Sequence, residues 1–516
     1  MIAKTYSATV LGIDAHPIDV EVDVSKGLSV FNIVGLPDNS IRESRDRVMT
    51  AISNSGISMP VRKVIVNLAP ANLRKIGSGF DLPIAVALLA ALDIFPAETL
   101  RDYMIVGELS LDGVIRPIRG VLPIAVTARD QGLKALILPK ANEAEAAVVS
   151  EIPRIPVDSL LDVVRYLQNN LQIDQTDYQI DALFQQNQNY AEDFQDVKGQ
   201  EHVKRAMEVA AAGNHNLLML GPPGSGKTML ARRMASILPC PSFEEALEST
   251  KIHSIAGLLP QNTALLATRP FRSPHHTISS AGLVGGGSIP GPGEISLAHN
   301  GVLFLDELPE FPRGVLELLR QPLEDHRVVI ARAAMSLEFP CNFLMLAAMN
   351  PCPCGYFGSK ASGVQSQPKE CRCTPIQIQK YRSKISGPLM DRIDIQLSVP
   401  AVEYSQLSDE RKGENSTSIR QKIIRARNIQ IERFNNSLTR NNANMTPKEC
   451  ELHANPAPNA RKILETAMNK MGLSARAYDR ILKVSRTIAD LAEAEIIDTP
   501  HITEAIQYRS LDRPIA

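Results

Sequence analysis

The alternation of apolar and polar positions divides residues 1–165 into strand-like and helix-like segments. Short runs rich in β-branched residues predict strands at 8–13, 18–24, 62–70 and 134–140. Segments 40–56 and 81–92 predict helices, and the second is expected to be buried because it is apolar almost all round. Residues 1–165 therefore predict a mixed α/β domain.

The apolar pattern stops at residue 166 and resumes near Phe194. Segment 166–192 contains no Lys or Arg, and 11 of its 27 residues are Gln or Asn. Such a polar segment buries too little apolar surface to offset the entropy lost on ordering, so we expect a linker. Apolar strands return over 193–400 and predict a second α/β domain, whereas 401–516 is predicted to be largely helical.

Composition places the chain among ordinary globular proteins. Its 516 residues suffice for two or three domains with separate cores, and 44% are apolar and 22% charged. With a net charge of −1, the chain as a whole lacks the excess of positive charge that attracts nucleic acid, so such binding would need a local basic surface. No apolar run reaches the roughly 18–20 residues that cross a bilayer, and we expect no secretory leader, because the first 17 residues contain no apolar segment before a cleavage site. We therefore expect a cytoplasmic protein with reduced thiols and no membrane partner.

A glycine-rich loop with the sequence GPPGSGKT lies at 221–228, between an apolar strand and the start of a helix. It matches the phosphate-binding pattern G-x-x-x-x-G-K-[ST] in full. The glycines permit a close backbone approach that a Cβ would forbid, so loop N–H groups and the helix N-terminus face a β-phosphate. Lys227 supplies a point charge between the β- and γ-phosphates, and the Thr228 hydroxyl a ligand for Mg²⁺. The predicted nucleotide-binding residues are Gly221, Pro222, Pro223, Gly224, Ser225, Gly226, Lys227 and Thr228.

Two further apolar strands end in polar residues suited to hydrolysis. The strand within GVLFLDELPEF ends at Asp306 and Glu307. Asp306 is predicted to hold Mg²⁺ through water, and Glu307 to orient and deprotonate the attacking water. The strand within NFLMLAAMN ends at Asn350, and pairing beside the first strand would bring its amide near the γ-phosphate. Together these residues predict an ATPase that uses ATP and Mg²⁺.

The order of these motifs, with ISGPLMDRIDI and LSARAYDRILKVSRTIADL, resembles AAA+ ATPases of the branch that holds magnesium-chelatase motor subunits and MCM helicases. The resemblance implies that Asn350 is the sensor-1 residue, Arg392 the arginine finger that completes a neighbouring subunit's site, and Arg476 the sensor-2 arginine. An arginine delivered in trans is worth about 10³–10⁵ in rate. It requires a ring oligomer, and a homohexamer is the expected form. The alternative for each arginine is an ordinary surface salt bridge.

Longer stretches of the sequence resemble one particular family within this branch. FRSPHHTISSAGLVGGGSIPGPGEISLAHNGVLFLDE, NPCPCGYFG and, near the start, GIDAHPIDVEVDVSKGL are similar to the ComM (YifB-type) magnesium-chelatase-like family over almost the whole chain. The family implies a hexameric DNA helicase that promotes branch migration during recombination in natural transformation. Its implied partners are single-stranded and branched DNA and recombination proteins. The implied fold is a multidomain α/β one, with a central AAA+ P-loop domain and a C-terminal helical lid.

The first domain resembles the proteolytic domain of Lon in RKIGSGFDLPIAVALLAAL and GELSLDGVIRPIRGVLPIAVTARDQGLKALILPKAN. Lon-type proteolysis needs a serine activated by a nearby lysine. Matched in register, the nucleophile's place holds Asp81 and the lysine's place holds Leu122. We therefore expect a ring-forming or DNA-contacting module without protease activity, with a rewired pair of Ser78 and Lys75 as the alternative.

Candidate DNA contacts are local. EDHRVVIARAAMSLEFP predicts a hairpin carrying Arg327 and Arg332, and in related motors a hairpin here projects into the central pore, where arginines can grip phosphates. An ordinary surface hairpin is the alternative. The Gly-rich segment 281–293, flanked by His275 and His276, is the second candidate pore loop. A cation-rich helix is predicted to present a solvated face, or else to face DNA, with Arg420, Lys422, Arg425 and Arg427.

Two Cys-x-Cys pairs, with 16 residues between them, follow Asn350. Four thiolates spaced in this way can bind one tetrahedral Zn²⁺, which would clip a long polar loop. Free reduced thiols and a redox switch are the alternatives. The predicted ligands are Cys352, Cys354, Cys371 and Cys373.

Three functional classes compete. A DNA translocase or branch-migration helicase is favoured. A chelatase-type motor acting on a protein partner is second. Such motors work with a partner bearing a D-x-S-x-S metal motif, and the lack of that motif here shows only that the partner role is not built into this chain. An ATP-dependent protease is opposed by Asp81 and Leu122.

Overall fold

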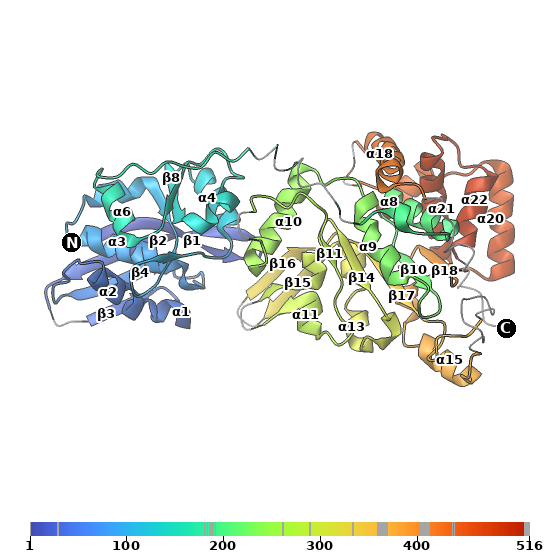
Figure 1. Ribbon diagram of the computed structural model, residues 1–516, viewed down its shortest axis with the longest axis horizontal. Helices are drawn as coiled ribbons and strands as arrows, with labels where there is room; N and C mark the ends of the chain where they lie inside the picture. Colours follow the sequence, from blue (N-terminus) through green and yellow to red (C-terminus); the bar gives the residue numbers. More distant parts are fainter. Residues whose placement is uncertain are drawn as a thin grey trace.

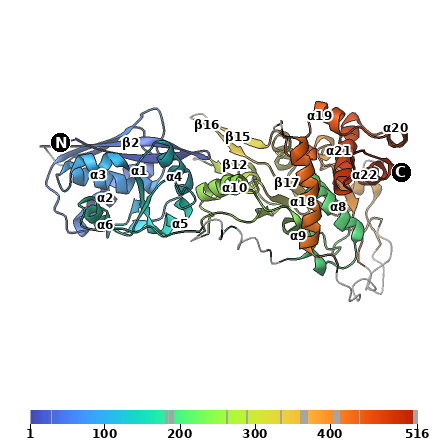
Figure 2. The ribbon, with the colours of Figure 1, turned by 90° about the horizontal axis from the view of Figure 1, so that it is seen from above.

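The computed structural model describes residues 2–27, 30–179, 182, 184, 190, 192–260, 263–287, 290–332, 335–358, 370–402, 413–435, 437 and 439–509. Its three parts lie in a row (Figure 1): the blue N-terminal domain at one end, the green and yellow central domain, and the red helices at the other end. The row persists in the view from above (Figure 2). Within the described part of the chain, no helix is both long and apolar enough to cross a membrane.

The N-terminal domain is built on a seven-stranded sheet of order β3-β4-β2-β1-β5-β8-β9. Strands β1, β2 and β4 pair antiparallel, and the remaining pairs are parallel. All four predicted strands overlap strands of this sheet, but the one predicted over 8–13 is wrong in its bounds, because β1 ends at Leu11 and Gly12 and Ile13 form the turn before β2. The strands are β1 (Ile2–Leu11), β2 (Asp14–Ser25), β3 (Val30–Val34), β4 (Lys63–Ala69), β5 (Tyr103–Ile105), β8 (Ala135–Pro139) and β9 (Arg154–Val157), with a separate hairpin of β6 (Glu108–Leu109) and β7 (Ile115–Arg116).

The helices of this domain follow the predicted pattern with one correction. Helix α3 (Asp81–Ala91) is buried at every residue, as its apolar sequence predicts. The single helix predicted over 40–56 is wrong in detail, because Glu43 separates α1 (Asn39–Arg42) from α2 (Ser44–Asn54). The other helices are α4 (Val121–Asp130), α5 (Glu143–Ala146) and α6 (Leu160–Leu167).

Residues 168–179 of the predicted linker lie against the N-terminal domain, whereas Tyr190 accepts a hydrogen bond from the Arg269 N–H of the central domain at 3.4 Å. Residues 168–179 form neither helix nor strand. The backbone N–H of Thr176 donates to Glu143 at 2.5 Å, and that of Arg154 donates to the Gln175 side chain at 3.2 Å. Polar side chains therefore hold this segment in place, together with Ile173, which packs against the N-terminal hydrophobic core.

The central domain is a five-stranded parallel sheet of order β11-β14-β17-β10-β18. Its inner strands are wholly buried, as expected for a parallel sheet covered by helices on both faces. The predicted second α/β domain is therefore present. Its strands are β10 (Leu217–Leu220), β11 (Phe271–Arg272), β14 (Val302–Leu305), β17 (Leu344–Met349) and β18 (Ile395–Ser398), and its longer helices are α8 (Glu201–Gly213), α9 (Lys227–Ile237) and α10 (Phe243–Ala256).

Two small hairpins of the central domain lie on the side of the N-terminal domain. Figure 1 shows one of them as β15 (Arg327–Arg332) and β16 (Met335–Pro340), and Figure 2 labels the first strand of the other, β12 (Gly285–Gly286). A cavity of 660 Å³ lies between them and the first domain, with Leu337 and Gly291 on one side and Ser78 and Glu108 on the other. The hairpins are β12 (Gly285–Gly286) with β13 (Gly291–Pro292), and β15 (Arg327–Arg332) with β16 (Met335–Pro340). The short helices are α11 (Ser280–Val284), α12 (Glu294–Leu297), α13 (Arg313–Glu317), α14 (Pro322–Asp325), α15 (Pro375–Arg382) and α16 (Gly387–Met390).

The C-terminal helices share one hydrophobic core with the central sheet. Leu230 of α9, Ile423 and Ile488 belong to the same buried cluster. The helices are α18 (Ser416–Arg433), α19 (Pro447–His453), α20 (Pro458–Met471), α21 (Ala475–Leu491) and α22 (Thr499–Gln507). The helical region predicted after residue 401 is thus present, packed onto the central domain.

Helix α18 corrects the prediction of a uniformly solvated or DNA-facing cationic face. Arg420 donates to the Ser236 carbonyl at 2.9 Å, and Arg427 donates to the Ala211 carbonyl at 2.8 Å. These two arginines hold α18 against α8 and α9. Lys422 and Arg425 pair with surface carboxylates and fit the solvated alternative.

Candidate active site

The glycine-rich loop links β10 to α9 and needs glycine for its shape. Gly224 and Gly226 have φ of 76° and 85°, in the left-handed region that side chains disfavour. A Cβ at Gly221 would lie 2.2 Å from the Val399 carbonyl oxygen. The loop therefore holds its backbone N–H groups at the N-terminus of α9, where a phosphate is favoured.

Lys227 joins the loop to the end of β17. Its ammonium donates to the carbonyls of Gly221 at 2.8 Å and Pro222 at 2.9 Å, and lies 3.4 Å from Asn350 Oδ1. Burial lowers the pKa of Lys227, while the carboxylates of Asp306 and Glu307 act against that shift. The buried ammonium of Lys227 therefore lies close to Asn350, Asp306 and Glu307, the three residues that the sequence predicts around the triphosphate.

Thr228 and Asp306 form a hydroxyl–carboxylate pair. The Thr228 hydroxyl donates to Asp306 Oδ2 at 2.7 Å, and the Glu307 backbone N–H donates to Asp306 Oδ1 at 2.9 Å. Hydroxyl and carboxylate oxygens are the ligands that Mg²⁺ prefers, usually together with waters and substrate phosphates. The donor set therefore fits Mg²⁺ bound with a nucleotide.

Glu307 stands in a strained backbone position. Its φ of 50° lies in the left-handed region, which costs a non-glycine residue about 1–2 kcal/mol. His276 Nδ1 lies 3.4 Å from Glu307 Oε2, and the His276 ring packs between His275 and Phe311. The sequence flagged His276 only as a flank of a pore loop, and its contact with Glu307 arises because β11 and β14 are neighbours.

Asn350 directly follows β17, which lies between β14 and β10. This strand order places Asn350 near Asp306 and the glycine-rich loop, as the sequence predicts.

Arg392 and Arg476 have carboxylate partners in their own chain. Arg392 pairs with Glu324 at 2.5 Å and is 12% exposed, whereas Arg476 pairs with Asp391 at 3.2 Å and is 65% exposed. Their catalytic roles stay predictions.

The four cysteines after Asn350 converge. Cys352 Sγ lies 3.3 Å from Cys354 Sγ and 3.7 Å from Cys371 Sγ, and the latter two are 3.6 Å apart. With Cys373, all four sulfurs lie within 4.8 Å of one another. The spacing therefore brings the predicted ligands together, although residues 359–369 between the pairs lie outside the described residues.

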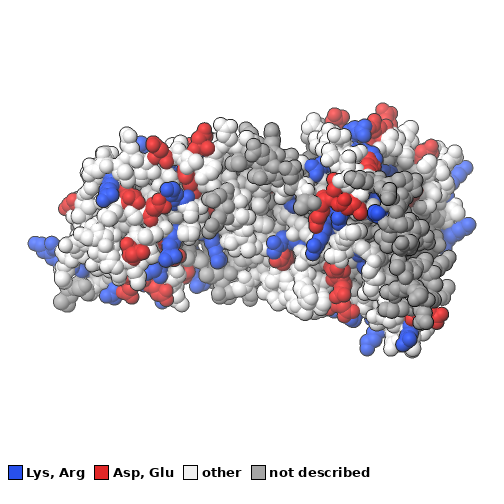
Figure 3. Space-filling view, viewed as in Figure 1, with Lys and Arg blue, Asp and Glu red and all other residues white. Residues whose placement is uncertain are grey.

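The predicted hairpin is present as β15 and β16. Arg327 stands at its base, half exposed and 3.4 Å from Glu338, and the side chain of Arg332 lies outside the described residues. Cationic and anionic side chains are interspersed over the face shown in Figure 3. A phosphate grip on this face would thus depend on a few local cations.

The Lon-like site lacks a serine–lysine pair. Asp81 is buried and receives two bonds from Arg47, at 2.7 and 3.0 Å, and burial raises its pKa although hydrogen bonds from Arg47 and Ser44 oppose the rise. Ser78 donates to Glu108, and Lys75 donates to the Pro70 carbonyl. The alternative of a rewired pair is therefore not formed.

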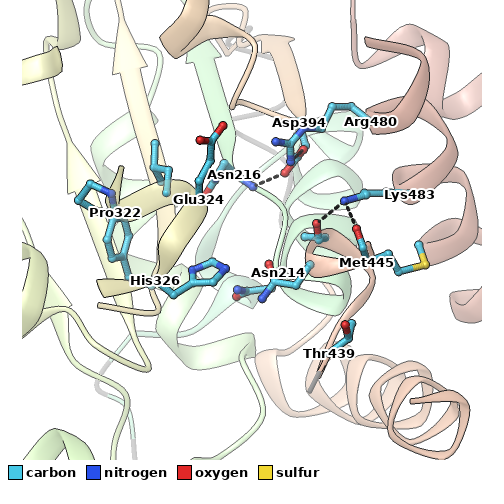
Figure 4. A pocket seen from close by; sticks show the side chains of 14 residues that line it. Asn214, Asn216, Pro322, Glu324, His326, Asp394, Thr439, Met445, Arg480 and Lys483 are labelled. Carbon is cyan, nitrogen blue, oxygen red and sulfur yellow. Dashed lines mark hydrogen bonds and ion pairs between the residues drawn. The ribbon is translucent and has the colours of Figure 1, made fainter. Parts of the chain in front are cut away.

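A separate cavity of 380 Å³ lies at the opposite end of β10 from the glycine-rich loop (Figure 4). Arg480 of α21 pairs there with Asp394 at 2.7 Å, and the Asn216 N–H donates to the same carboxylate at 3.0 Å. Burial opposes the charge on Asp394, yet Arg480 and His215 beside it hold its pKa well below the ordinary range. This polar wall anchors α21 to the central sheet.

Comparisons with known proteins cover nearly the whole chain. The model "Magnesium chelatase, subunit ChlI" matches residues 193–407, "Subunit ChlI of Mg-chelatase" matches 20–142, and "Magnesium chelatase, subunit ChlI C-terminal" matches 413–509. Competence protein ComM of Haemophilus influenzae is 43% identical over 99% of this chain and 98% of its own. The uncharacterized protein YifB of Escherichia coli is 43% identical over 98% and 97%. Lon protease 2 of Bacillus subtilis is 32% identical over 28% of this chain and 27% of its own, which confirms the predicted Lon-like similarity.

Proposed function

Because the chain belongs to the magnesium-chelatase-like AAA+ family that includes competence protein ComM and YifB, we propose that it is an ATP-driven, ring-shaped DNA translocase. In this proposal it acts as a helicase that promotes branch migration during homologous recombination in natural transformation. The observation that carries the proposal is the convergence of Lys227, Thr228, Asp306 and Asn350 on one edge of the sheet. Recombination with incoming DNA places the protein in the cytoplasm.

The proposed hydrolysis uses the side chains already in contact. Mg²⁺, when bound with ATP, neutralises charge on the β- and γ-phosphates. Lys227 exchanges its loop carbonyls for phosphate oxygens, while Thr228 and Asp306 hold the metal side of the site. Glu307 orients the attacking water and takes its proton, and Asn350 holds the γ-phosphate side.

A ring is proposed because Arg392 is held away from the glycine-rich loop of its own chain, so a role in hydrolysis would require the loop of a neighbouring subunit. Its partner Glu324 belongs to α14, and that pair lies beside the cavity at the far end of β10. In a homohexamer, Arg392 would leave Glu324 and face the nucleotide of the neighbouring subunit. Arg476 heads α21 and is proposed as the sensor that follows the nucleotide state within the same chain.

DNA is proposed to contact the two hairpins of the central domain. Arg327 on β15 is half exposed and is balanced by Glu338 at 3.4 Å, which is a weak surface pair. A phosphate can therefore displace Glu338 at little cost. In the hairpin of β12 and β13, a Cβ built on Gly291 meets no heavy atom within 4 Å, so a sugar–phosphate backbone can approach there.

Unwinding of a forked or three-stranded DNA by the purified full-length protein tests the proposal. We expect strand separation only with ATP and Mg²⁺, and ATP hydrolysis that rises when single-stranded DNA is added. Lys227→Ala should abolish both activities, and Lys462→Ala, which changes an exposed lysine on α20, should retain them. If DNA neither binds nor stimulates hydrolysis, the helicase proposal is wrong.

The hairpin contact has its own test. Arg327→Ala should weaken single-stranded DNA binding and lower the salt dependence of log Kd by about one unit, because one phosphate contact is lost. Arg461→Ala, an exposed arginine on α20, is the matched control. Equal affinity and salt dependence in both variants would place the DNA elsewhere.

A motor that remodels a protein partner is the second candidate function. It is favoured by the family models, whose descriptions name a magnesium chelatase subunit. This candidate predicts hydrolysis that a protein partner stimulates and DNA does not. The same ATPase assay therefore separates the two candidates.

A further inference from the structure

The cysteine cluster has the geometry of a tetrahedral metal site. Zinc bound to four thiolates at about 2.3 Å holds the sulfurs about 3.8 Å apart. The three distances among Cys352, Cys354 and Cys371 are 3.3, 3.6 and 3.7 Å, and Cys373 completes the set. A single disulfide would engage only two of these four sulfurs, whereas one ion at their centre engages all of them.

The backbone around the cluster supports negatively charged sulfurs. The Phe357 N–H donates to Cys352 Sγ at 3.3 Å, and the backbone of Tyr356 and Arg372 also bonds Cys354. Donors of this kind orient metal-bound ligands and stabilise their charge. Gly355, with φ of 87°, follows the second thiol, and its N–H donates to the Cys352 carbonyl at 3.0 Å to close the turn that carries the first cysteine pair.

The cluster also touches the glycine-rich loop. A Cβ built on Gly355 would lie 2.6 Å from Pro223 Cδ and 4.0 Å from Asn350 Cγ, so the turn rests directly on the P-loop and beside the predicted sensor. Pro223 precedes Gly224, one of the positive-φ residues of that loop. A displacement of the turn would therefore change the support of the phosphate site.

Both ends of the cysteine segment are attached to the same place. Arg382 Nε donates to the Pro351 carbonyl at 3.1 Å, and its guanidinium lies 5.6 Å from the Phe357 ring centroid. Tyr381 bonds the backbone of Asn350. Because Thr374 caps α15 directly after Cys373, the second cysteine pair is joined to the helix that carries these two side chains.

We propose that Cys352, Cys354, Cys371 and Cys373 bind one structural Zn²⁺, and that this bound ion buttresses Pro223 and Asn350 so that zinc loading sets the affinity for ATP. The coupling rests on the proposed ATPase function, whereas the metal site does not. Binding releases the thiol protons to solvent, and the ion links the first cysteine pair to the second. Four cysteines also suit an iron–sulfur cluster, which the test must distinguish.

Elemental analysis of the purified full-length protein tests the metal site. We expect one zinc per chain in the unchanged protein and in Cys240→Ser, a matched control outside the cluster. The double variant Cys371→Ser/Cys373→Ser should contain none. Growth with cobalt should give the visible absorption of tetrahedral Co²⁺–thiolate. Absence of bound metal, or iron with acid-labile sulfide in its place, would overturn the proposal.

Binding of a fluorescent ATP analogue tests the coupling. Removal of zinc by a chelator should weaken the affinity at least about tenfold, and added Zn²⁺ should restore it. Gly355→Ala, which leaves all four thiols in place, should retain zinc and weaken nucleotide binding, since its Cβ collides with Pro223. Lys227→Ala should retain zinc but lose nucleotide, so a failed ATPase is distinguished from a failed metal site. Unchanged affinity in both the zinc-free protein and Gly355→Ala would overturn the coupling.

Discussion

His276 Nδ1 lies 3.4 Å from Glu307 Oε2, and this contact ties the segment that follows β11 to the predicted catalytic base after β14. Both side chains are partly exposed, at 31% and 54%. An ion pair of this kind contributes about 0–1 kcal/mol. It can orient the carboxylate, and it is weak enough to be given up when a water must be activated.

These magnitudes predict unequal effects for the two partners. Glu307→Gln should lower steady-state ATP hydrolysis by about 10²–10⁴-fold, the usual contribution of a general base, while ATP still binds. His276→Ala should change the rate by less than about tenfold, because only the weak pair is lost. Steady-state hydrolysis and equilibrium binding of ATP to each variant measure both quantities. Normal turnover of Glu307→Gln would show that another group takes the proton.

The Arg392–Glu324 pair predicts complementation between subunits. Arg392→Ala and Lys227→Ala should each be inactive alone, since one lacks the finger and the other lacks the nucleotide charge. Mixed rings should recover part of the hydrolysis, because an intact finger of one subunit then faces an intact loop of the other. The rate is measured after the two variants are mixed in varied ratios, with each variant alone as the control. An inactive mixture at every ratio would contradict a finger acting in trans.

Local chemistry made much of the site predictable. The glycine-rich loop, the carboxylates after β14 and the amide after β17 each follow a buried strand, and parallel strands bring their carboxyl ends to one edge. Asp306 and Asn350 therefore lie near Lys227 as expected. The convergence of the four thiols was also predictable. The two cysteines of each pair are already close in sequence, so only the two pairs have to be brought together.

Contacts between distant elements were not predictable from local pattern. The cations of α18 repeat along a helix as a solvated face would, yet Arg420 and Arg427 reach carbonyls of α9 and α8 that lie about 180 and 220 residues away in sequence. His276 meets Glu307 only because the sheet places β11 beside β14. Which two distant side chains meet depends on the tertiary structure, and the periodicity of a single helix or strand does not reveal it.

Asp81 predicts what restoring a serine would do. Asp81→Ser places a hydroxyl at the Lon-like nucleophile position, but Leu122 leaves it without a base, so no proteolysis should follow. The change also leaves Arg47 without its two-bond partner inside the domain. Arg47 keeps 22% of its side chain exposed and has Glu43 at 3.7 Å, so the free energy of unfolding should fall by about 1–3 kcal/mol, the range for a buried polar group that loses its partner.

Thermal unfolding and degradation of an unfolded protein substrate measure the two effects. Asp81→Asn, which keeps the shape of the side chain and one acceptor oxygen, is the matched control and should be less destabilised. ATP-dependent degradation by the unchanged chain or by Asp81→Ser would contradict the absence of a serine–lysine pair.

His215 predicts a loss of stability in mild acid. Its ring is fully buried, Nε2 lies 2.7 Å from the Thr487 hydroxyl, and burial lowers its pKa, with Arg480 and Lys483 acting in the same direction and Asp394 against them. In the unfolded chain a histidine titrates near pH 6.5. As the pH falls through about 6.5, the unfolded state therefore binds a proton that the folded state does not, and the free energy of unfolding decreases.

The expected loss is about 1 kcal/mol between pH 7.5 and about pH 5.5 from this residue, because one pKa unit corresponds to about 1.4 kcal/mol. Unfolding midpoints at the two pH values measure it. His215→Gln lacks the titrating ring, so its midpoint should fall less with pH, even where its stability at the higher pH is reduced. His275→Gln, which changes an exposed ring, should keep the pH dependence of the unchanged protein. An equal pH dependence in all three proteins would contradict this prediction. It would mean that the acid sensitivity arises from other buried groups, and that the folded state protonates His215 at least as readily as the unfolded chain does.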